Sequence, residues 1–255
     1  MLTAMGYAVC AASTAQAAGF LLREQSAAGM GNAFAGATAG AEDGSYSFYN
    51  PAGIIRQAGT QASVNATAII GDAKGYNATG NRKYQRQMDH VVDKKVLPSV
   101  ALTHALNSRT SFGLSLSAPF GLVTDYSPTW VGANHGTLSD LTTYNLTPML
   151  AYRATCNLTL GAGLVVQYID ANLKSGTMQN MGVLPYNDIV ANMKGDDTSL
   201  GYIVGALYEF SPRTRVGVSY RSEVKHKLKG EVSFNRNIPQ AGIVNQNIDA
   251  SVKTP

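Results

Sequence analysis

The chain has 255 residues, of which 45% are apolar and only 14% are charged, and its formal net charge is +4. Low charge with this apolar content excludes a disordered chain, and so mild a positive charge gives no reason to expect a nucleic-acid partner. After the N-terminus no run of about 18 apolar residues occurs, so we expect no transmembrane helix. A β-barrel could still span a membrane, because its strands are individually weak sequence signals.

The first 17 residues are small and apolar, and they end in Ala15-Gln16-Ala17, a pattern typical of a signal-peptide cleavage site. We therefore expect residues 1–17 to be a signal peptide and the protein to be exported; a buried N-terminal helix is the alternative. Cys10 lies within this segment. Cys156 is then the one cysteine of the mature chain, so we expect no intrachain disulfide.

Residues 18–54 form a segment rich in glycine and in other small side chains. These side chains are too small to hold a core of their own, so we expect the segment to pack inside a larger structure. It ends near Asn50-Pro51, a strong turn signal, because proline fixes its own φ and favours extended backbone at the residue before it. Beyond Ile54 the sequence pattern changes, which places a domain boundary there.

From Gly59 onward apolar residues recur at every second position, which is the period of a β-strand. In the clearest case, Phe112, Leu114 and Leu116 alternate with serine and glycine. We expect strands at about residues 58–70, 96–106, 110–120, 141–153, 157–173, 199–210 and 213–232, with an eighth beginning near residue 249.

A soluble β-sandwich and a transmembrane β-barrel would both show this alternation, and three features favour the barrel. The strands are about 10 residues or longer, as a tilted crossing of a bilayer requires. Tyrosines recur near strand ends, as in an interfacial aromatic belt. Tight turns alternate with long connections, as between periplasmic turns and external loops; the long connections lie at about residues 71–95, 121–140, 171–198 and 233–247.

Three separated motifs resemble the FadL family, the outer-membrane transporters of long-chain fatty acids and related hydrophobic compounds. The first comprises Gly19-Phe20, Glu24-Gln25-Ser26, Gly29-Met30-Gly31, Ala33-Phe34-Ala35-Gly36 and Asn50-Pro51-Ala52. The second is Tyr220-Arg221-Ser222-Glu223-Val224-Lys225 followed by Lys229-Gly230, and the third is Gly121-Leu122-Val123-Thr124 with Asp140-Leu141. Because they occur in the expected order, the resemblance covers the chain from Gly19 to its last residue.

The resemblance implies an antiparallel barrel of fourteen strands with an N-terminal plug in its lumen. Residues 18–54 would be the plug, with Glu24, Asn50, Pro51 and Ala52 in the matching motifs, and residues 55–255 would be the first half of the barrel. The implied function is passive, ligand-gated uptake of a long-chain fatty acid, or of an aromatic hydrocarbon as in related members. A purely structural or adhesive outer-membrane barrel is the alternative from a different class.

Ala118-Pro119-Phe120-Gly121 is the first candidate functional stretch. Proline removes a ladder donor and glycine relaxes the backbone, so the third strand should bend or lose its pairing near Pro119, Phe120 and Gly121. The simpler interpretation is that Pro119 merely ends the strand. The resemblance favours the break, because the family's third strand is kinked and leaves a lateral exit beside the plug.

The second candidate site is the lumen near the external loops, where a cation could orient a carboxylate. The candidates are Lys174 on the fifth strand and Arg221, Glu223, Lys225 and Lys227 on the seventh; they could instead solvate the lumen or pair with the plug. Apolar loop residues would catch the ligand, namely Met178, Met181, Leu184 and Ile189, unless they pack loop on loop.

No catalytic constellation emerges from the sequence, so we expect no enzyme, no cofactor and no metal site. The four histidines are far apart, and His104 and His226 fall on the apolar face of their strands. No Gly-x-Ser-x-Gly motif occurs, which argues against a lipase. The expected partners are a hydrophobic small molecule and outer-membrane lipid, and the protein is expected to be a monomer.

Overall fold

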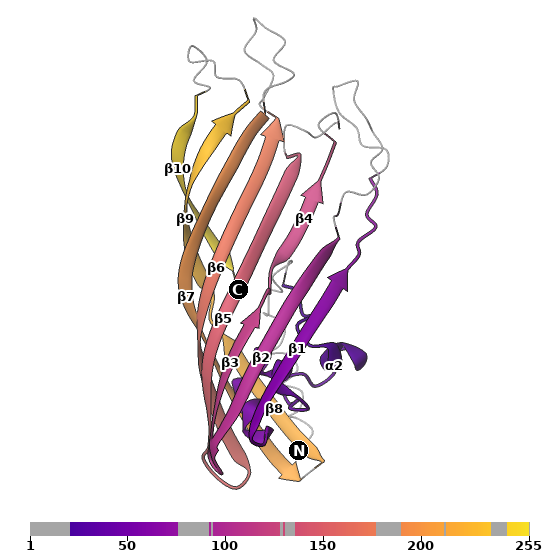
Figure 1. Ribbon diagram of the computed structural model, residues 1–255, viewed down its shortest axis with the longest axis vertical. Coiled ribbons are helices and arrows are strands. Elements are labelled where there is room, and N and C mark those ends of the chain that lie inside the picture. Colours follow the sequence, from indigo (N-terminus) through magenta and orange to yellow (C-terminus); the bar gives the residue numbers. More distant parts are fainter. Residues whose placement is uncertain are drawn as a thin grey trace, which may run out of the picture.

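A computed structural model describes residues 21–75, 92, 94–127, 130, 136–176, 190–211, 213–235 and 244–254. The expected signal peptide lies outside these ranges. The described chain begins with a short irregular segment and continues as one long antiparallel sheet, as expected from the alternation (Figure 1).

The N-terminal segment, residues 21–57, contains three single-turn helices, each begun by a polar cap. They are α2 (Ala27–Gly31), η2 (Gly44–Phe48) and η3 (Pro51–Arg56). The Ser26 hydroxyl accepts a hydrogen bond from the Gly29 N–H, and the Asn50 side chain accepts one from the Ala52 N–H, both at 3.0 Å. Such caps satisfy backbone donors that a helix start leaves free, and Pro51 suits the first helical position because it has no N–H.

Ten strands form the sheet in the described residues. They are β1 (Thr60–Ile69), β2 (Lys95–Asn107), β3 (Thr110–Ser117), β4 (Gly121–Asp125), β5 (Leu138–Arg153), β6 (Leu158–Gly176), β7 (Val190–Ser211), β8 (Thr214–Arg221), β9 (Val224–Phe234) and β10 (Gln246–Thr254). Neighbours follow the chain in the order β1-β2-β3-β5-β6-β7-β9-β10, while β4 pairs with β5 and β8 pairs with β7.

Two expected strands are each interrupted, and two expected loops are partly strand. The strand expected at 110–120 ends at Ser117 with β3, and β4 follows after a break, while the strand expected at 213–232 divides into β8 and β9. The bounds expected for the connection at 171–198 are wrong, because β6 runs to Gly176 and β7 starts at Val190. The connection expected at 121–140 likewise contains β4 and the start of β5. The outward apolar alternation ends in these parts because the outer face becomes polar, as at Asp170, Asn172 and Lys174, while the apolar residues Ile169, Ala171 and Leu173 lie on the inner face.

The sheet has an apolar outer face and a polar inner face, the reverse of a soluble protein. The inner face is the one that contacts the N-terminal segment, and it buries serine, threonine, asparagine and glutamine side chains, among them Ser99, Thr103, Ser115, Asn145, Thr147 and Gln167. The outer face exposes large apolar side chains, among them Val100, Leu102, Leu116, Leu146, Leu150, Leu164, Leu200, Val204, Val216 and Val218. This arrangement is typical of a barrel wall that faces lipid outside and water inside.

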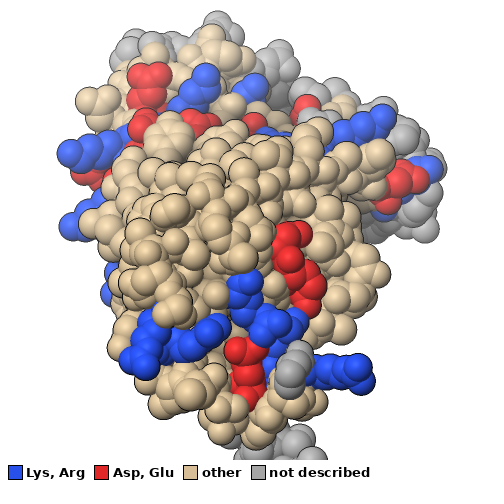
Figure 2. Space-filling view, turned by 60° about the horizontal axis from the view of Figure 1, so that its bottom comes forward, with Lys and Arg blue, Asp and Glu red and all other residues tan. Residues whose placement is uncertain are grey.

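Tyrosines mark the two ends of the apolar outer face. On β5, Tyr152 lies near the tight turns and Tyr144 lies toward the long connections, and both are about half exposed. Eight residues of extended strand span about 26 Å, of the order of the apolar band of an outer-membrane barrel. Figure 2 shows the charged residues gathered toward the two ends, with a broad uncharged surface between them.

No helix in the described ranges is long and apolar enough to cross a membrane. The free cysteine, Cys156, is exposed in the tight turn between β5 and β6.

Candidate functional site: the interrupted wall and the lumen

The wall is interrupted between β3 and β4, at Ala118, Pro119 and Phe120. The β2–β3 ladder ends at the pair Val100↔Leu116. Beyond it, β4 pairs with β5 alone, apart from one isolated bridge between Val92 and Thr124. Residues 95–99 of β2 therefore have a ladder partner on the β1 side but none on the β4 side. The expected loss of pairing near Pro119 is present.

The N-terminal segment supplies the hydrogen bonds that the ladder lacks here. Gln25, which is completely buried, donates from Nε2 to the Ala118 carbonyl at 3.0 Å and accepts from the Ala118 N–H at 3.2 Å. The Leu22 N–H donates to the Pro119 carbonyl at 2.8 Å. One side-chain amide thus pairs with both backbone groups of Ala118, as a neighbouring strand would. On the β2 side the break is closed by the segment, while Phe120 is held to Thr143 of β5 at 2.8 and 3.0 Å.

Apolar side chains fill the remaining space at the break. Phe120 and Leu97 are almost completely buried. A Cβ at Gly121 would lie 3.5 Å from Leu97 and 3.7 Å from Leu22, so the glycine brings β4 close to both side chains. The Lys95 ammonium reaches past Gly121 to β5, where it lies 3.4 Å from Asp140 Oδ1 and 3.0 Å from Thr142 Oγ1. Lys95 is thus a cation at the mouth of the break.

The second half of the N-terminal segment lies directly on the inner wall, against three glycines of neighbouring strands. A Cβ at Gly161 would be 2.3 Å from the Ala52 nitrogen, one at Gly205 2.1 Å from Asn50 Oδ1, and one at Gly217 1.9 Å from the Thr38 oxygen. No side chain fits at these distances, so glycine is required. The Asn50 amide also donates to the Ala206 carbonyl of β7 at 3.0 Å.

Charged side chains fasten the same half of the segment to the wall. Arg215 donates to the Ala39 carbonyl and to Glu42, both at 2.6 Å. Arg56 pairs with Glu209. Arg221 donates to the Phe48 carbonyl at 2.8 Å and lies 4.7 Å from the centre of the Phe48 ring. Arg221, expected as a ligand cation, therefore holds the N-terminal segment in place.

Glu24 is half-buried near the break, on the side of the segment that faces Tyr49. The Tyr49 hydroxyl donates to the Arg23 carbonyl, and burial, followed by the charge of Glu24, raises the pKa of Tyr49. Tyr49 therefore stays neutral and continues to donate, which ties the chain around Glu24 to the half of the segment that lies on the wall.

Lys174 and Lys225 do not face the lumen, so their expected placement is wrong. Lys174 shares the outer face of β6 with Leu164 and Tyr168. In β8 the odd-numbered residues face inward, but in β9 the even-numbered residues Val224, His226 and Leu228 are the buried ones. One extra residue at Ser222-Glu223 reverses the alternation, because a strand's side chains have a period of two. Glu223 and Lys227 also lie on the outer side.

His226, expected on an apolar face, is instead completely buried on the inner face. Its Nδ1 lies 3.0 Å from Asp197 Oδ2 and its Nε2 lies 2.8 Å from Gln167 Oε1. Gln167 in turn donates to Asn145 Oδ1 at 2.7 Å. Both ring nitrogens therefore lie within hydrogen-bond distance of a side-chain oxygen. A buried polar row therefore crosses the inner wall from β5 to β9.

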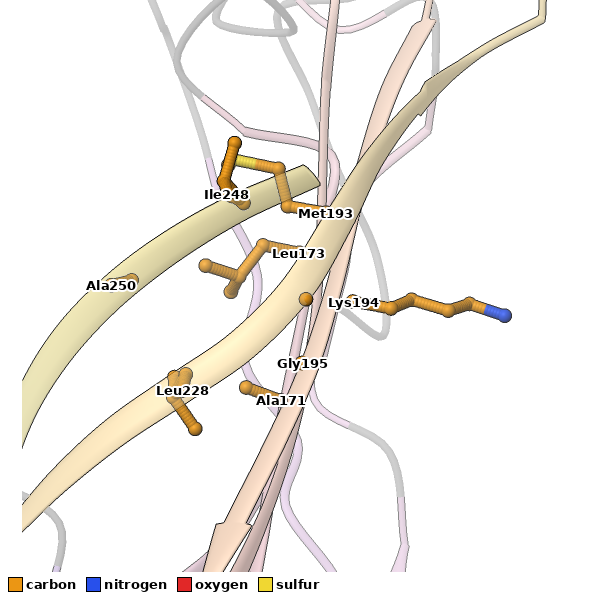
Figure 3. Close-up of a pocket in the computed structure, with 9 residues that line it drawn as sticks. Ala171, Leu173, Met193, Lys194, Gly195, Leu228, Ile248 and Ala250 are labelled. Carbon is orange, nitrogen blue, oxygen red and sulfur yellow. The ribbon is translucent and has the colours of Figure 1, made fainter. Parts of the chain in front are cut away.

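A small apolar hollow lies just above this polar row, on the side of the long connections. Its volume is about 60 Å³. Figure 3 shows Leu173, Met193 and Ile248 converging from three strands, while Lys194 points away. The other lining residues are Ala171, Gly195, Leu228, Gly230 and Ala250. The hollow is smaller than the roughly 300 Å³ at which ligand pockets begin, so it can hold only part of a long chain.

Four expected loop residues, Met178, Met181, Leu184 and Ile189, lie outside the described residues. Within the described ranges, no group of three His, Cys, Asp or Glu side chains could hold a metal ion. The interpretation of the sequence missed Lys95 and the closing role of Gln25. Gln25 does lie in the Glu24-Gln25-Ser26 motif, whereas nothing in the sequence distinguishes Lys95 from other lysines.

Comparison with known proteins agrees with this architecture. Curated relatives include the long-chain fatty acid transport protein of Salmonella typhi, 30% identical over 94% of this chain and 60% of the relative. The 47 kDa outer membrane protein of Pasteurella multocida (strain Pm70) is 29% identical over 91% of this chain and 55% of the relative. The chain thus spans 55 to 60% of the length of these relatives.

Solved structures share the fold. A FadL homologue from Pseudomonas aeruginosa superposes with a TM-score of 0.72 at 23% identity, over 92% of this chain and 64% of that one. The toluene transporter TbuX of Ralstonia pickettii gives a TM-score of 0.56 at 16% identity, over 84% of this chain and 59% of that one. A family model described as outer membrane protein transport protein (OMPP1/FadL/TodX) matches residues 8–254. The chain therefore belongs to this family of outer membrane transport proteins.

Proposed function

We propose that the full-length protein lies in the outer membrane and carries long-chain fatty acids across its wall by passive diffusion. Residues 18–54 are the plug of the barrel, and the ligand leaves sideways through the break at Pro119. The membrane lipid is then both the solvent of the apolar outer face and the destination of the ligand. The protein acts as a monomeric transporter and not as an enzyme.

The observation that carries this proposal is the closure of the break by Gln25. A break sealed by the sheet itself could open only by unfolding the wall. Here the Ala118 backbone is held by one side chain of a separate segment, at 3.0 and 3.2 Å, so the wall opens when that segment moves. Because the other half of the segment is fastened to the glycines of β6, β7 and β8, residues 22–26 can move while residues 38–57 stay in place.

The sideways route suits an apolar ligand. A long hydrocarbon chain gains about 0.8 kcal/mol for each CH₂ group removed from water, so a route from an apolar hollow into lipid is favoured over a watery pore. Phe120, Leu97 and Leu22 line that route with apolar surface. Lys95 lies at its mouth, where its ammonium can contact a carboxylate.

Uptake of a monoaromatic hydrocarbon is the second candidate, favoured by one observation. The described lumen hollow has a volume of about 60 Å³ and an apolar lining, and the cations expected beside it face outward or bind the N-terminal segment. A ligand without a carboxylate would need none of them. The relatives include a protein named as a long-chain fatty acid transport protein and one named as a toluene transporter.

Uptake by cells separates the two candidates. The full-length protein would be produced in cells that lack transporters of this family, and uptake of a radiolabelled long-chain fatty acid would be compared with that of labelled toluene. We expect fatty-acid uptake to rise well above that of cells without the protein. A rise for toluene alone would establish the second candidate, and no rise for either ligand would refute transport.

A further inference from the structure

The wall has a second interruption, between β7 and the strand formed by β8 and β9. The β7–β8 ladder ends at Ile203↔Arg221, and the β7–β9 ladder begins at Asp196↔Lys229. Residues 197–202 of β7 therefore have no ladder partner on this side. The facing residues, 224–228, keep their ladder with β10, so β9 diverges from β7 without losing its other neighbour.

Side chains of the wall itself close this second interruption. The Ser222 hydroxyl accepts from the Tyr202 N–H at 2.9 Å, and Asp197 Oδ2 accepts from the Lys227 N–H at 3.2 Å. Val224 fills the centre, since a Cβ at Gly201 would lie 2.7 Å from its Cγ2. The described partners of Val224 and His226 are Gly201, Gln167 and Asp197, all of the wall, so the two interruptions are closed by different parts of the chain.

The inner side of this interruption leads directly to the apolar hollow. Asp197 lies two residues along β7 from Gly195, and His226 lies two residues along β9 from Leu228; Gly195 and Leu228 line the hollow. Val224 and His226 are buried between the outer surface and that lining, and Ser222 and Asp197 lie beside them in the interruption. An apolar chain passing between β7 and β9 would therefore enter the hollow by its lower edge.

The outer side carries a cluster of lysines at the border of the lipid-facing surface. The reversed alternation of β9 places Lys225 and Lys227 outward, and Lys253 is the ladder partner of Lys225. Glu223 lies 3.2 Å from Lys225 and 3.8 Å from Lys253, so one carboxylate pairs with two of the three ammonium groups. Higher on the same face, Lys229 has the acidic ladder partners Asp196 and Asp249. Below the cluster the outer face is apolar, with Leu200 and Tyr202 exposed.

We propose that the interruption between β7 and β9 is an entry portal through which a long-chain fatty carboxylate dissolved in the outer leaflet passes sideways into the lumen hollow. The carboxylate of such a molecule lies at the lipid border, where Lys225, Lys227 and Lys253 would hold it, while its tail lies beside Leu200 and Tyr202. Displacement of Val224 and His226 admits the tail. This portal rests on the proposed uptake function, and it places entry and exit at two different interruptions of one wall.

A reversible lock across the portal tests this assignment. In the full-length protein with Cys156→Ser, the pair Gly201→Cys and Val224→Cys can form a disulfide, because a Cβ at position 201 would lie 2.7 Å from the Val224 side chain. We expect fatty-acid uptake by cells to fall to background when the pair is oxidised and to recover with a reductant. The matched control is Thr60→Cys with His104→Cys, ladder partners in an intact part of the wall.

Surface charge gives a second, independent arm that does not depend on the lock. The variant Lys225→Gln/Lys227→Gln/Lys253→Gln should lower uptake of the acid by about tenfold, because charge-assisted hydrogen bonds are lost, and should leave its methyl ester unchanged. Lys174→Gln/Lys229→Gln removes charges from the outer face outside this cluster and should affect neither ligand.

Two results would overturn the portal. One is normal uptake by the oxidised Gly201→Cys/Val224→Cys variant, when a second disulfide variant, Ser26→Cys with Ser45→Cys, still loses uptake on oxidation. The other is an equal loss of acid and ester uptake in the lysine variant. If the proposed function itself were wrong, the wild-type protein would give no uptake above background, so the two failures are distinguishable.

Discussion

Gln25 pairs with the wall through a single amide group, and its two hydrogen bonds to Ala118 determine how easily the first interruption opens. Gln25→Ala removes both of its hydrogen bonds to Ala118 and leaves the buried N–H and carbonyl of that residue without a partner. We expect the free energy of unfolding to fall by about 1–3 kcal/mol. The wall should also leak, so conductance in planar bilayers should rise.

The matched control for this substitution is Gln61→Ala, which removes an exposed glutamine whose one described bond goes to the Ala58 carbonyl. It should change neither the free energy of unfolding nor the conductance. If Gln25→Ala had the conductance of the wild type, the amide would be a packing contact and not the closure of the wall.

Lys95 is the cation that the structure places at the mouth of the exit. Lys95→Gln keeps a polar side chain of nearly the same length but loses its charge-assisted bond to Asp140 or to a passing carboxylate. We expect slower uptake of a long-chain fatty acid by about fivefold or more, and unchanged uptake of its methyl ester. Competition between acid and ester in the same cells measures this ratio. Equal slowing of both would assign Lys95 to the wall alone.

At the scale of elements, the break between β3 and β4 is the feature that transport depends on. Pro119→Thr with Gly121→Val supplies a backbone donor and a residue that favours strands, so pairing should extend through the break and displace Leu22 from the Pro119 carbonyl. Barrel stability should hold or rise while fatty-acid uptake falls sharply. A correctly inserted double variant with normal uptake would mean that the ligand leaves along the barrel axis.

The sequence predicted the first interruption but not the second, for a physical reason. Pro119 and Gly121 are residues whose backbone chemistry weakens a strand, so the break could be read from their identity. The second interruption comes from one extra residue near Ser222-Glu223, which ordinary strand residues accommodate. A shift of one residue reverses every later side chain, and Lys225 was therefore assigned to the lumen and His226 to the outer face, both wrongly.

The ends of β6 and β7 show the same limit. Outward apolar alternation predicts only the part of a strand that faces lipid. The strands continue beyond it with polar residues on the outer face, as at Asp170 and Lys174 of β6. The closure by Gln25 also depends on a contact between residues far apart in the sequence, which no local pattern encodes. The wall was thus predictable, but the parts that close it were not.

At the scale of the whole molecule, the exposed apolar side chains between the two ends require a lipid environment. A soluble protein rarely exposes a contiguous apolar patch above a few hundred Å². We expect the full-length protein to fractionate with the outer membrane and to migrate faster in gel electrophoresis when unheated than when boiled, as a folded barrel does. Recovery in the soluble fraction, with the same mobility before and after boiling, would contradict the barrel assignment.

The central claim is that residues 22–26 must leave the wall at Ala118 before the ligand can pass, while the other half of the N-terminal segment stays in place. The Ser26 and Ser45 hydroxyl oxygens lie 2.7 Å apart, so Ser26→Cys with Ser45→Cys, in a chain with Cys156→Ser, can tie the two halves together by a disulfide. The direct measurement is fatty-acid uptake by this variant with and without a reductant. We predict uptake at background when the pair is oxidised and near the wild-type rate when it is reduced. Equal uptake in both states, with the disulfide verified, would contradict the account.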